Sequence, residues 1–313
     1  MGILVIGAVF VDIKGYPTSQ YIPGGRNAGR VVTVHGGVAR NVAEDLGNVG
    51  VSPLLLSLVE DTGIGRDVMG HLEKVGVRTE YMGLKEDGMG TWLAVFENTG
   101  DVVASISKRP NLHAIEDILS EKGDEILEKA DSLVLEMDMD VSLLEQIFSL
   151  AQKHGKKVYG LVSNMSIALE RRSFIAKTSC FVCNKQEAEL FFSENFVAQE
   201  GEALAEELYN KIQMAGVPQM VVTMGGDGSF YACSLTGEKG VVKAPKVDVI
   251  DTTGCGDAFC AGLSLGLTYG KSLREACEIG TRLATSVVAT TESVCPNFRP
   301  EEFGLKGYPG EKA

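Results

Sequence analysis

The chain alternates short apolar runs with amphipathic stretches, and this alternation constrains the fold more than any other feature. Residues 3–12 (ILVIGAVFVD) form a near-continuous apolar run, which is typical of a strand buried on both faces of a parallel sheet. Residues 51–60 repeat this pattern, and residues 64–77 between such runs have the spacing of an amphipathic helix. The alternation predicts an α/β fold, with one doubly wound, mostly parallel sheet and helices on both faces.

The same rhythm continues to the end of the chain. Strands are expected at 132–138, 157–163, 180–184 and 220–225, and helices within 36–50 and at 142–155, 200–215, 255–269 and 272–290.

Two regions depart from this rhythm. Prolines and glycines punctuate residues 13–34, which predicts loop and short strand. Alternating runs on either side of Asn98-Thr99-Gly100 predict a hairpin over 91–107, and a second hairpin is expected over 228–245. We therefore expect one domain over 1–313, with a small β lid built from about 13–35 and 88–108.

Composition excludes several classes of protein. A formal charge of −13 argues against a nucleic-acid polymer or an anionic membrane surface as partner. No apolar stretch is long enough to span a bilayer, and the N-terminus has no basic segment typical of a signal peptide. Seven cysteines without regular spacing do not resemble a secreted disulfide framework. These features predict a cytoplasmic protein.

The strongest chemical signal is DTTGCGDAFCAGLSLGL, residues 251–267. Gly254 and Gly256 allow a sharp turn that presents successive amides, and the helix that follows adds unpaired amides and a partial positive charge. Together they predict an anion hole for a phosphoryl group in transfer, with Asp257 at its mouth. The helix terminus would keep Asp257 ionised, as a weak base that orients an alcohol. A helix-capping aspartate beside a tight turn would produce the same local pattern.

DTTGCGDAF closely resembles the C-terminal signature of the ribokinase-like (PfkB) carbohydrate kinases, and residues 36–50 (GGVARNVAEDLGNVG) resemble their N-terminal signature. The resemblance runs from about residue 3 to residue 296. It implies that Asp257 is the catalytic base, and that Gly254, Cys255 and Gly256 form the anion hole. Cys255 stands where the family usually has alanine; only its amide is needed, although a thiol near phosphate could make the enzyme sensitive to oxidation.

The resemblance also implies the remaining sites. ATP would be the phosphoryl donor with Mg²⁺, and K⁺ stays open as a further cofactor. NKQEAE (184–189) resembles the family's N-P-x-E motif, although Lys185 replaces the proline, and TMGGDGSF (223–230) resembles its nucleotide-binding turn. The implied nucleotide-binding residues are Asn184, Glu187, Thr223, Gly225 and Gly228, with Glu187 on Mg²⁺ through water and Asp251 near a possible monovalent cation. The implied acceptor-binding residues are Asp12, Gly36, Gly37 and Asn41.

The acceptor is less sharply defined. The run GGVARN looks closest to pseudouridine kinases within the family, and the apolar Val38 suits a nucleoside base better than a charged sugar acid. Ribose, fructose and 2-keto-3-deoxygluconate stay open as acceptors. So does a phosphorylated sugar, because Arg26, Arg30 and Arg40 lie near the expected site. Trp92 belongs either to the lid core or to the acceptor wall.

Two other functional classes share the α/β pattern. A dinucleotide-dependent oxidoreductase would need a glycine-rich fingerprint after the first strand, where this chain has GAVFVD. A non-catalytic sugar or nucleotide sensor on the same fold stays possible, since a fold does not determine an activity. Cys180 and Cys183 are expected to be ordinary core residues. The exposed edge of the lid suggests a homodimer.

Overall fold

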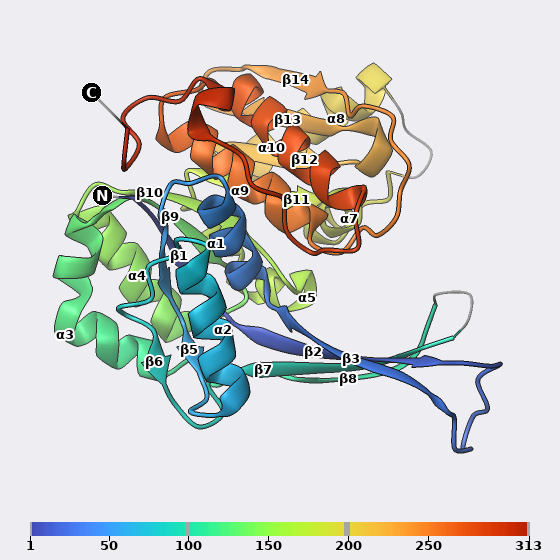
Figure 1. Cartoon of the computed structure of the whole chain (residues 1–313). Coiled ribbons are helices and arrows are strands. Elements are labelled where there is room, and N and C mark those ends of the chain that lie inside the picture. Colours follow the sequence, from blue (N-terminus) through green and yellow to red (C-terminus); the bar gives the residue numbers. More distant parts are fainter. Residues whose placement is uncertain (1, 98–100, 197–200, 312–313) are drawn as a thin grey trace.

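The computed structural model describes residues 2–97, 101–196 and 201–311 (Figure 1). Over these residues an eight-stranded sheet forms the centre, in the order β14-β13-β12-β11-β10-β9-β1-β4. Strands β4 to β12 in this order pair in parallel, and β13 and β14 are antiparallel additions at one edge. The strands are β1 (Gly2–Ile6), β4 (Leu54–Leu56), β9 (Ala130–Glu136), β10 (Lys157–Leu161), β11 (Cys180–Asn184), β12 (Gln219–Thr223), β13 (Ser229–Cys233) and β14 (Lys239–Val242).

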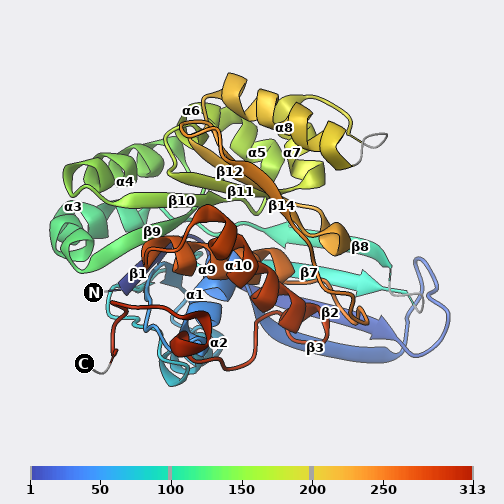
Figure 2. The same ribbon diagram turned by 90° about the horizontal axis from the view of Figure 1, so that it is seen from above.

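Helices cover both faces of this sheet (Figure 2). Along β1, Ile3 and Val5 point into one buried cluster and Leu4 and Ile6 into the other, so the strand is apolar on both sides. The first face carries α1 (Val38–Asn48), α2 (Gly63–Lys74), α9 (Cys255–Thr268) and α10 (Leu273–Val288). The second carries α3 (Ala114–Glu128), α4 (Val141–Lys153), α5 (Met165–Ala168), α6 (Arg172–Ile175), α7 (Lys185–Phe192) and α8 (Gly201–Ala215). The doubly wound fold is confirmed.

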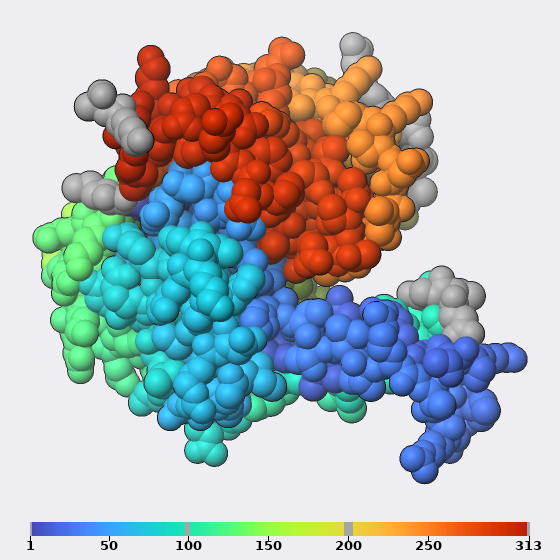
Figure 3. Space-filling model, in the orientation of Figure 1, coloured from blue at the N-terminus to red at the C-terminus, as the bar shows by residue number. Residues whose placement is uncertain are grey.

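A second, four-stranded sheet projects from this body as an arm (Figures 1 and 3). Its strand order is β3-β2-β7-β8, with β2 (Phe10–Pro17), β3 (Gly29–Gly36), β7 (Gly90–Phe96) and β8 (Val102–Lys108). The hairpin predicted over 91–107 is confirmed by the antiparallel pairing of β7 with β8. Its predicted turn at 98–100 lies outside the described residues. The hairpin predicted over 228–245 is confirmed as β13 and β14.

Two predictions near the N-terminus were wrong. Residues 3–12 are not one strand: β1 ends at Ile6, and the chain leaves the main sheet to begin β2 at Phe10. Residues 13–34 are not mainly loop, because β2 and β3 pair along their whole length. The prolines and glycines had suggested a loop, but only three of the six lie in the turn between these strands, and the other three belong to β2 and β3. One of these is Gly29, where an added Cβ would meet the carbonyl oxygen of Tyr16 at 2.3 Å.

The structure also differs from the predicted elements in smaller ways. The run 51–60 is interrupted at Ser57, whose hydroxyl donates to the carbonyl of Gly7 at 2.6 Å, and it continues as β5 (Leu58–Val59), which pairs with β6 (Gly83–Leu84). Helices α3, α5, α6 and α7 occupy segments in which no helix was predicted. Among the described residues, no helix is both long and apolar enough to cross a membrane.

Candidate functional site

The glycine turn before α9 presents the first amides of that helix. Gly254 is the N-cap residue with φ of 80°, a conformation that favours glycine, and an added Cβ there would lie 1.9 Å from the carbonyl oxygen of Ser293. The amide of Thr253 donates to the Asp251 carboxylate at 2.8 Å, which tightens the turn. By helix geometry, the amides of Gly256 and Asp257 have no partner within α9. The turn can therefore bind an anion at the helix N-terminus.

Two signatures that are distant in sequence meet at Asp257. Asn41 on α1 donates from Nδ2 to Oδ2 of Asp257 on α9, at 2.6 Å, across 216 positions of the chain. The contact arises because α1 and α9 pack side by side on one face of the sheet. The expected catalytic and acceptor-binding residues thus lie in one place.

Asp257 is partly exposed, and its surroundings alter the pKa of its carboxyl group. Desolvation raises the pKa of this carboxyl to about 7, although the hydrogen bond from Asn41 and the charge of Arg40 act to lower it. The sequence had suggested a weak base, kept ionised by the helix terminus. In the structure, desolvation raises the pKa of Asp257 close to neutral, which suits a general base better than an ordinary aspartate does.

The expected acceptor residues lie at the base of the arm. Gly36 ends β3 beside Asp12, and an added Cβ would be 2.7 Å from Oδ1 of that carboxylate. Gly37 has φ of 100° and precedes α1, where its carbonyl accepts from the amide of Asn41 at 2.8 Å. Desolvation raises the pKa of Asp12, and the positive charges of Lys14 and Arg40 oppose that rise. The glycine pair lets the arm, α1 and Asp12 approach closely.

Glu136 also belongs to this region, and no site was predicted there from the sequence. It is buried at the end of β9, and Oε2 accepts from the amide of Ala8 at 2.8 Å. Desolvation and the nearby Asp138 raise the pKa of Glu136 to about 8, and the charge of Asp257 acts in the same direction. The sequence does contain a signal for this residue, because Glu136 ends the apolar run SLVLE. Ligand sites of parallel sheets lie at the carboxyl ends of strands, so a glutamate at this position is a candidate site residue.

A cavity of about 510 Å³ opens on the other side of the glycine turn. Thr223, Gly225 and Gly228 line it from β12 and the turn that follows, and Cys255 and Gly256 line it from the start of α9. Its remaining walls come from residues 244–249 and from α10, and they are largely apolar. The volume lies in the range of small-molecule sites. The structure thus brings three expected nucleotide-binding residues together with two of the anion hole.

Asn184 and Glu187 form the N-terminal cap of α7. The side chain of Asn184 accepts from the amide of Glu187 at 2.9 Å, and the carboxylate of Glu187 accepts from the amide of Asn184 at 2.8 Å. Burial raises the pKa of Glu187, and the neighbouring Asp138 adds to the rise. Glu187 also acts on the pKa of Asp257, so these carboxyl groups share one electrostatic environment.

These oxygen donors fit Mg²⁺, which prefers carboxylates and usually keeps several waters or phosphate oxygens as further ligands. Among the described residues, no group of three or more potential ligand side chains converges. The chain therefore offers isolated carboxylates, of which Glu187 is one, rather than a closed cage.

The cysteines are structural in character. Cys180 and Cys183 are buried on opposite faces of β11 and belong to different core clusters, as expected for core residues. Desolvation and nearby carboxylates raise the pKa of Cys255 to about 11. This thiol therefore carries little thiolate at neutral pH, which argues against the suggested sensitivity to oxidation.

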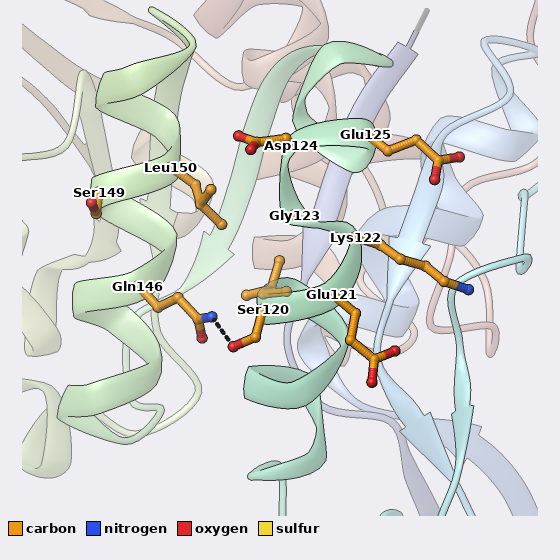
Figure 4. A pocket seen from close by; sticks show the side chains of 10 residues that line it. Ser120, Glu121, Lys122, Gly123, Asp124, Glu125, Gln146, Ser149 and Leu150 are labelled. Atoms are coloured by element: carbon orange, nitrogen blue, oxygen red, sulfur yellow. Dashed lines mark hydrogen bonds between the residues drawn. The ribbon is translucent and has the colours of Figure 1, made fainter.

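A second surface depression lies between α3 and α4 (Figure 4). Polar side chains line it, including Ser120 and Gln146, which hydrogen-bond at 2.9 Å. The two helices cover the face of the sheet opposite α1 and α9. This depression is therefore separated by the sheet from the residues around Asp257.

Comparisons with known proteins agree with this geometry. The model of the pfkB family carbohydrate kinases matches residues 2–297. A guanosine-inosine kinase of Exiguobacterium acetylicum is 34% identical over 93% of this chain and 95% of its own length. The pseudouridine kinase of Escherichia coli is 26% identical over 87% of both chains. The fold matches a ribokinase of Arabidopsis thaliana solved with ribose and ATP, with a TM-score of 0.83, 20% identity and coverage of 96% and 98%.

The match to the family model extends over nearly the whole chain and includes both signatures that meet at Asp257. The protein is therefore a phosphotransferase that acts on a sugar or nucleoside, and it belongs to the PfkB family of carbohydrate kinases.

Proposed function

We propose that this kinase transfers the γ-phosphate of ATP to a primary hydroxyl of a nucleoside, with Asp257 as the catalytic base. The carboxylate accepts the proton of the acceptor hydroxyl as its oxygen attacks the γ-phosphorus, and the bond to the β-phosphate oxygen breaks to release ADP. The amides at Gly254, Cys255 and Gly256 stabilise the charge on the transferring group. The observation that carries the proposal is the hydrogen bond between Asn41 and Asp257 beside the N-terminus of α9.

The 510 Å³ cavity is the proposed ATP site. Its apolar walls suit a purine base, and Thr223, Gly225 and Gly228 would face the ribose and phosphates. Thr281 on α10 lines the same cavity and has a buried hydroxyl without a hydrogen-bond partner among the described residues, so it is available to a ligand.

Glu187, supported by Asn184, would hold Mg²⁺ through water. When bound, the ion neutralises negative charge on the phosphates. Asp251, whose carboxylate already fixes the turn through Thr253, is the proposed neighbour of a monovalent cation such as K⁺. Both assignments extend the family resemblance to this chain.

The acceptor would bind between Asp12, the Gly36–Gly37 pair, Asn41 and Glu136. An aromatic row continues from Asp12 along the same face of the arm. Trp92 pairs with Asp12 in the parallel register of β2 and β7, and Phe96 lies 6.3 Å from Trp92 and 4.8 Å from Tyr16, between ring centroids. Aromatic rings beside the sugar site suit a planar base, which favours a nucleoside over a free sugar.

Two relatives point in the same direction. The 34% identical protein is a guanosine-inosine kinase and the 26% identical protein a pseudouridine kinase, and both act on nucleosides. The sequence motifs had favoured a pseudouridine-like acceptor. The higher identity of the first relative makes guanosine and inosine the first acceptors to test. Arg40 is occupied by protein partners, which weakens the case for a phosphorylated acceptor.

The arm is the proposed lid, which would close over the acceptor and exclude water. Its face opposite Asp12 exposes Val31, Leu93 and Ile106, at 70%, 40% and 69% of their surface. Such an apolar face supports a homodimer through the arm. A cytoplasmic location, expected from the free cysteines, completes the proposal.

The test is an ADP-release assay with Mg²⁺–ATP over guanosine, inosine, pseudouridine, ribose, fructose and 2-keto-3-deoxygluconate. We expect the highest kcat/KM with a purine nucleoside. Turnover with free sugars alone would refute the nucleoside acceptor. If no acceptor supports turnover but ATP still binds, a sensor on this fold is the better explanation.

A further inference from the structure

Arg40 is a buried arginine that the proposed mechanism does not use. Its side chain is 3% exposed and lies on α1, directly before Asn41. Nη1 donates to the carboxylate of Glu44, one turn further along the helix, and Nη2 donates to the carbonyl of His35 at 2.8 Å. Nη2 also donates to Oδ1 of Asn41. The guanidinium is thus held next to the catalytic region by acceptors on α1 and at the end of β3.

The hydrogen bond from Arg40 to Asn41 determines how the side-chain amide of Asn41 is oriented. A guanidinium can only donate hydrogen bonds, so the oxygen of the Asn41 amide must face Arg40. The amide nitrogen then faces Asp257 and donates to Oδ2. Because Nδ2 is committed to that oxygen, the other oxygen of Asp257 is left for the acceptor hydroxyl.

We propose that Arg40 is a positioning residue, which fixes the amide of Asn41 and thereby holds the carboxylate of Asp257 in the orientation required of the base. This inference rests on the proposed role of Asp257. Without Arg40, the amide of Asn41 could turn and present its oxygen to the carboxylate, where two acceptors would repel each other.

The positive charge of Arg40 also favours the ionised form of Asp257, as the orientation of the Asn41 amide does. Groups around Asp257 from four elements influence its titration or are influenced by it: Arg40 and Asp45 on α1, Glu136 on β9, Glu187 on α7, and the thiols of Cys255 and Cys260 on α9. Arg40 is the positively charged member of this group, and its charge lowers the pKa of Asp257. The charge of Glu187 raises that pKa. Loss of Arg40 should therefore leave the base harder to ionise.

Arg40 also connects this region to the loop that supports the anion hole. Nη2 lies 3.4 Å from the hydroxyl of Ser293, and the carbonyl of that residue packs against Gly254. The carboxylate of Glu44, which accepts from Arg40, also lies 2.7 Å from Nε2 of His71 on α2. His71 thus helps to hold Glu44 in place. The guanidinium thus links the acceptor side to the phosphate side.

The experiment compares Arg40→Met and Arg40→Lys with the unchanged protein. Arg40→Met removes both the charge and the planar donor set, whereas Arg40→Lys keeps a charge but loses the fork that holds two acceptors in one plane. We expect the pH midpoint of kcat to rise by about one unit in Arg40→Met, so that the loss of kcat is about fivefold larger at pH 7 than above pH 9, where only the loss of orientation remains. Arg40→Lys should restore only part of that shift.

A matched control separates positioning from stability. Arg78 is a partly buried arginine beside Gly2, at the opposite end of β1, and two of its guanidinium nitrogens are buried without a partner among the described residues. Arg78→Lys should change the unfolding temperature without moving the pH midpoint. If both Arg40 variants lower kcat by the same factor at every pH, Arg40 is merely structural and the inference is wrong.

A second readout does not depend on the acceptor. The side-chain carboxyl of Asp257, assigned by loss of its ¹³C signal in Asp257→Asn, can be titrated in the protein without substrates. Its midpoint should rise in Arg40→Met. An unchanged midpoint overturns the inference. A shifted midpoint in a protein that phosphorylates no acceptor would refute the proposed function, and the positioning role with it, and would leave only the effect of the Arg40 charge on Asp257.

Discussion

Gly254→Ala is the substitution whose effect the structure specifies most closely. Gly254 has φ of 80°, and a Cβ built on it would lie 1.9 Å from the carbonyl oxygen of Ser293, which is backbone and cannot rotate away. Because contacts of this kind do not fall below 3.0 Å, Ser293 or the turn must move by 3.0 − 1.9 = 1.1 Å. That displacement would separate the amides of the turn from the phosphoryl group they are proposed to bind.

Two effects contribute to the loss of stability expected in Gly254→Ala. A residue other than glycine in the left-handed region costs about 1–2 kcal/mol, and overpacking against fixed atoms typically costs a further 1–3 kcal/mol. We therefore expect Gly254→Ala to lower the free energy of unfolding by about 2–5 kcal/mol. A misplacement of about 1 Å in catalytic groups can lower kcat about 100-fold.

A substitution at a second glycine measures the cost of the left-handed backbone conformation alone. Gly270, between α9 and α10, has φ of 84°, and an added Cβ would meet nothing within 4 Å. Gly270→Ala should cost only the 1–2 kcal/mol of backbone strain and leave kcat unchanged. Denaturant unfolding and ADP-release kinetics of both variants test this reasoning. It fails if Gly254→Ala is no less stable than Gly270→Ala, or if it keeps full kcat.

Four further predictions follow from the site and the arm. Asp257→Asn should lower kcat by about 10²–10⁴-fold. Because burial raises the pKa of Asp257 from 3.8 to about 7, the folded protein binds a proton between about pH 4 and 7 that the unfolded chain has released, so this group's contribution to stability falls as the pH rises through that window. Asp257→Asn should therefore unfold at a higher temperature than the unchanged protein at pH 8 and at a similar one at pH 4. Trp92→Ala should raise KM for a nucleoside about tenfold, the effect of losing an aromatic contact, and leave KM for ribose unchanged if the row of rings binds the base. Ile106→Lys should give a monomeric mass by light scattering if the arm forms a dimer, whereas Leu235→Lys, at a position that is 79% exposed outside the arm, should not. Glu187→Gln should raise the Mg²⁺ concentration needed for half-maximal kcat, and an unchanged requirement would remove Glu187 from the metal site.

The N-terminal region shows where sequence patterns fail. Residues 3–12 are apolar enough to read as one strand, but β1 and β2 belong to different sheets. Local composition cannot reveal this break, because the exit at Gly7 depends on Glu136, which lies 2.5 Å from the position of a Cβ on that glycine. The partner is 129 positions away in sequence and adjacent only after folding.

The sequence by itself determined the doubly wound sheet, the hairpins and the glycine turn before α9, because each depends on local periodicity or on the conformations that glycine allows. Only the tertiary structure decided the state of the site. It brings Asn41 to Asp257, adds Glu136 and Arg40 to their surroundings, and raises the pKa of Asp257 toward neutrality. Desolvation and charge act through space between elements distant in the chain, so no local pattern carries that information.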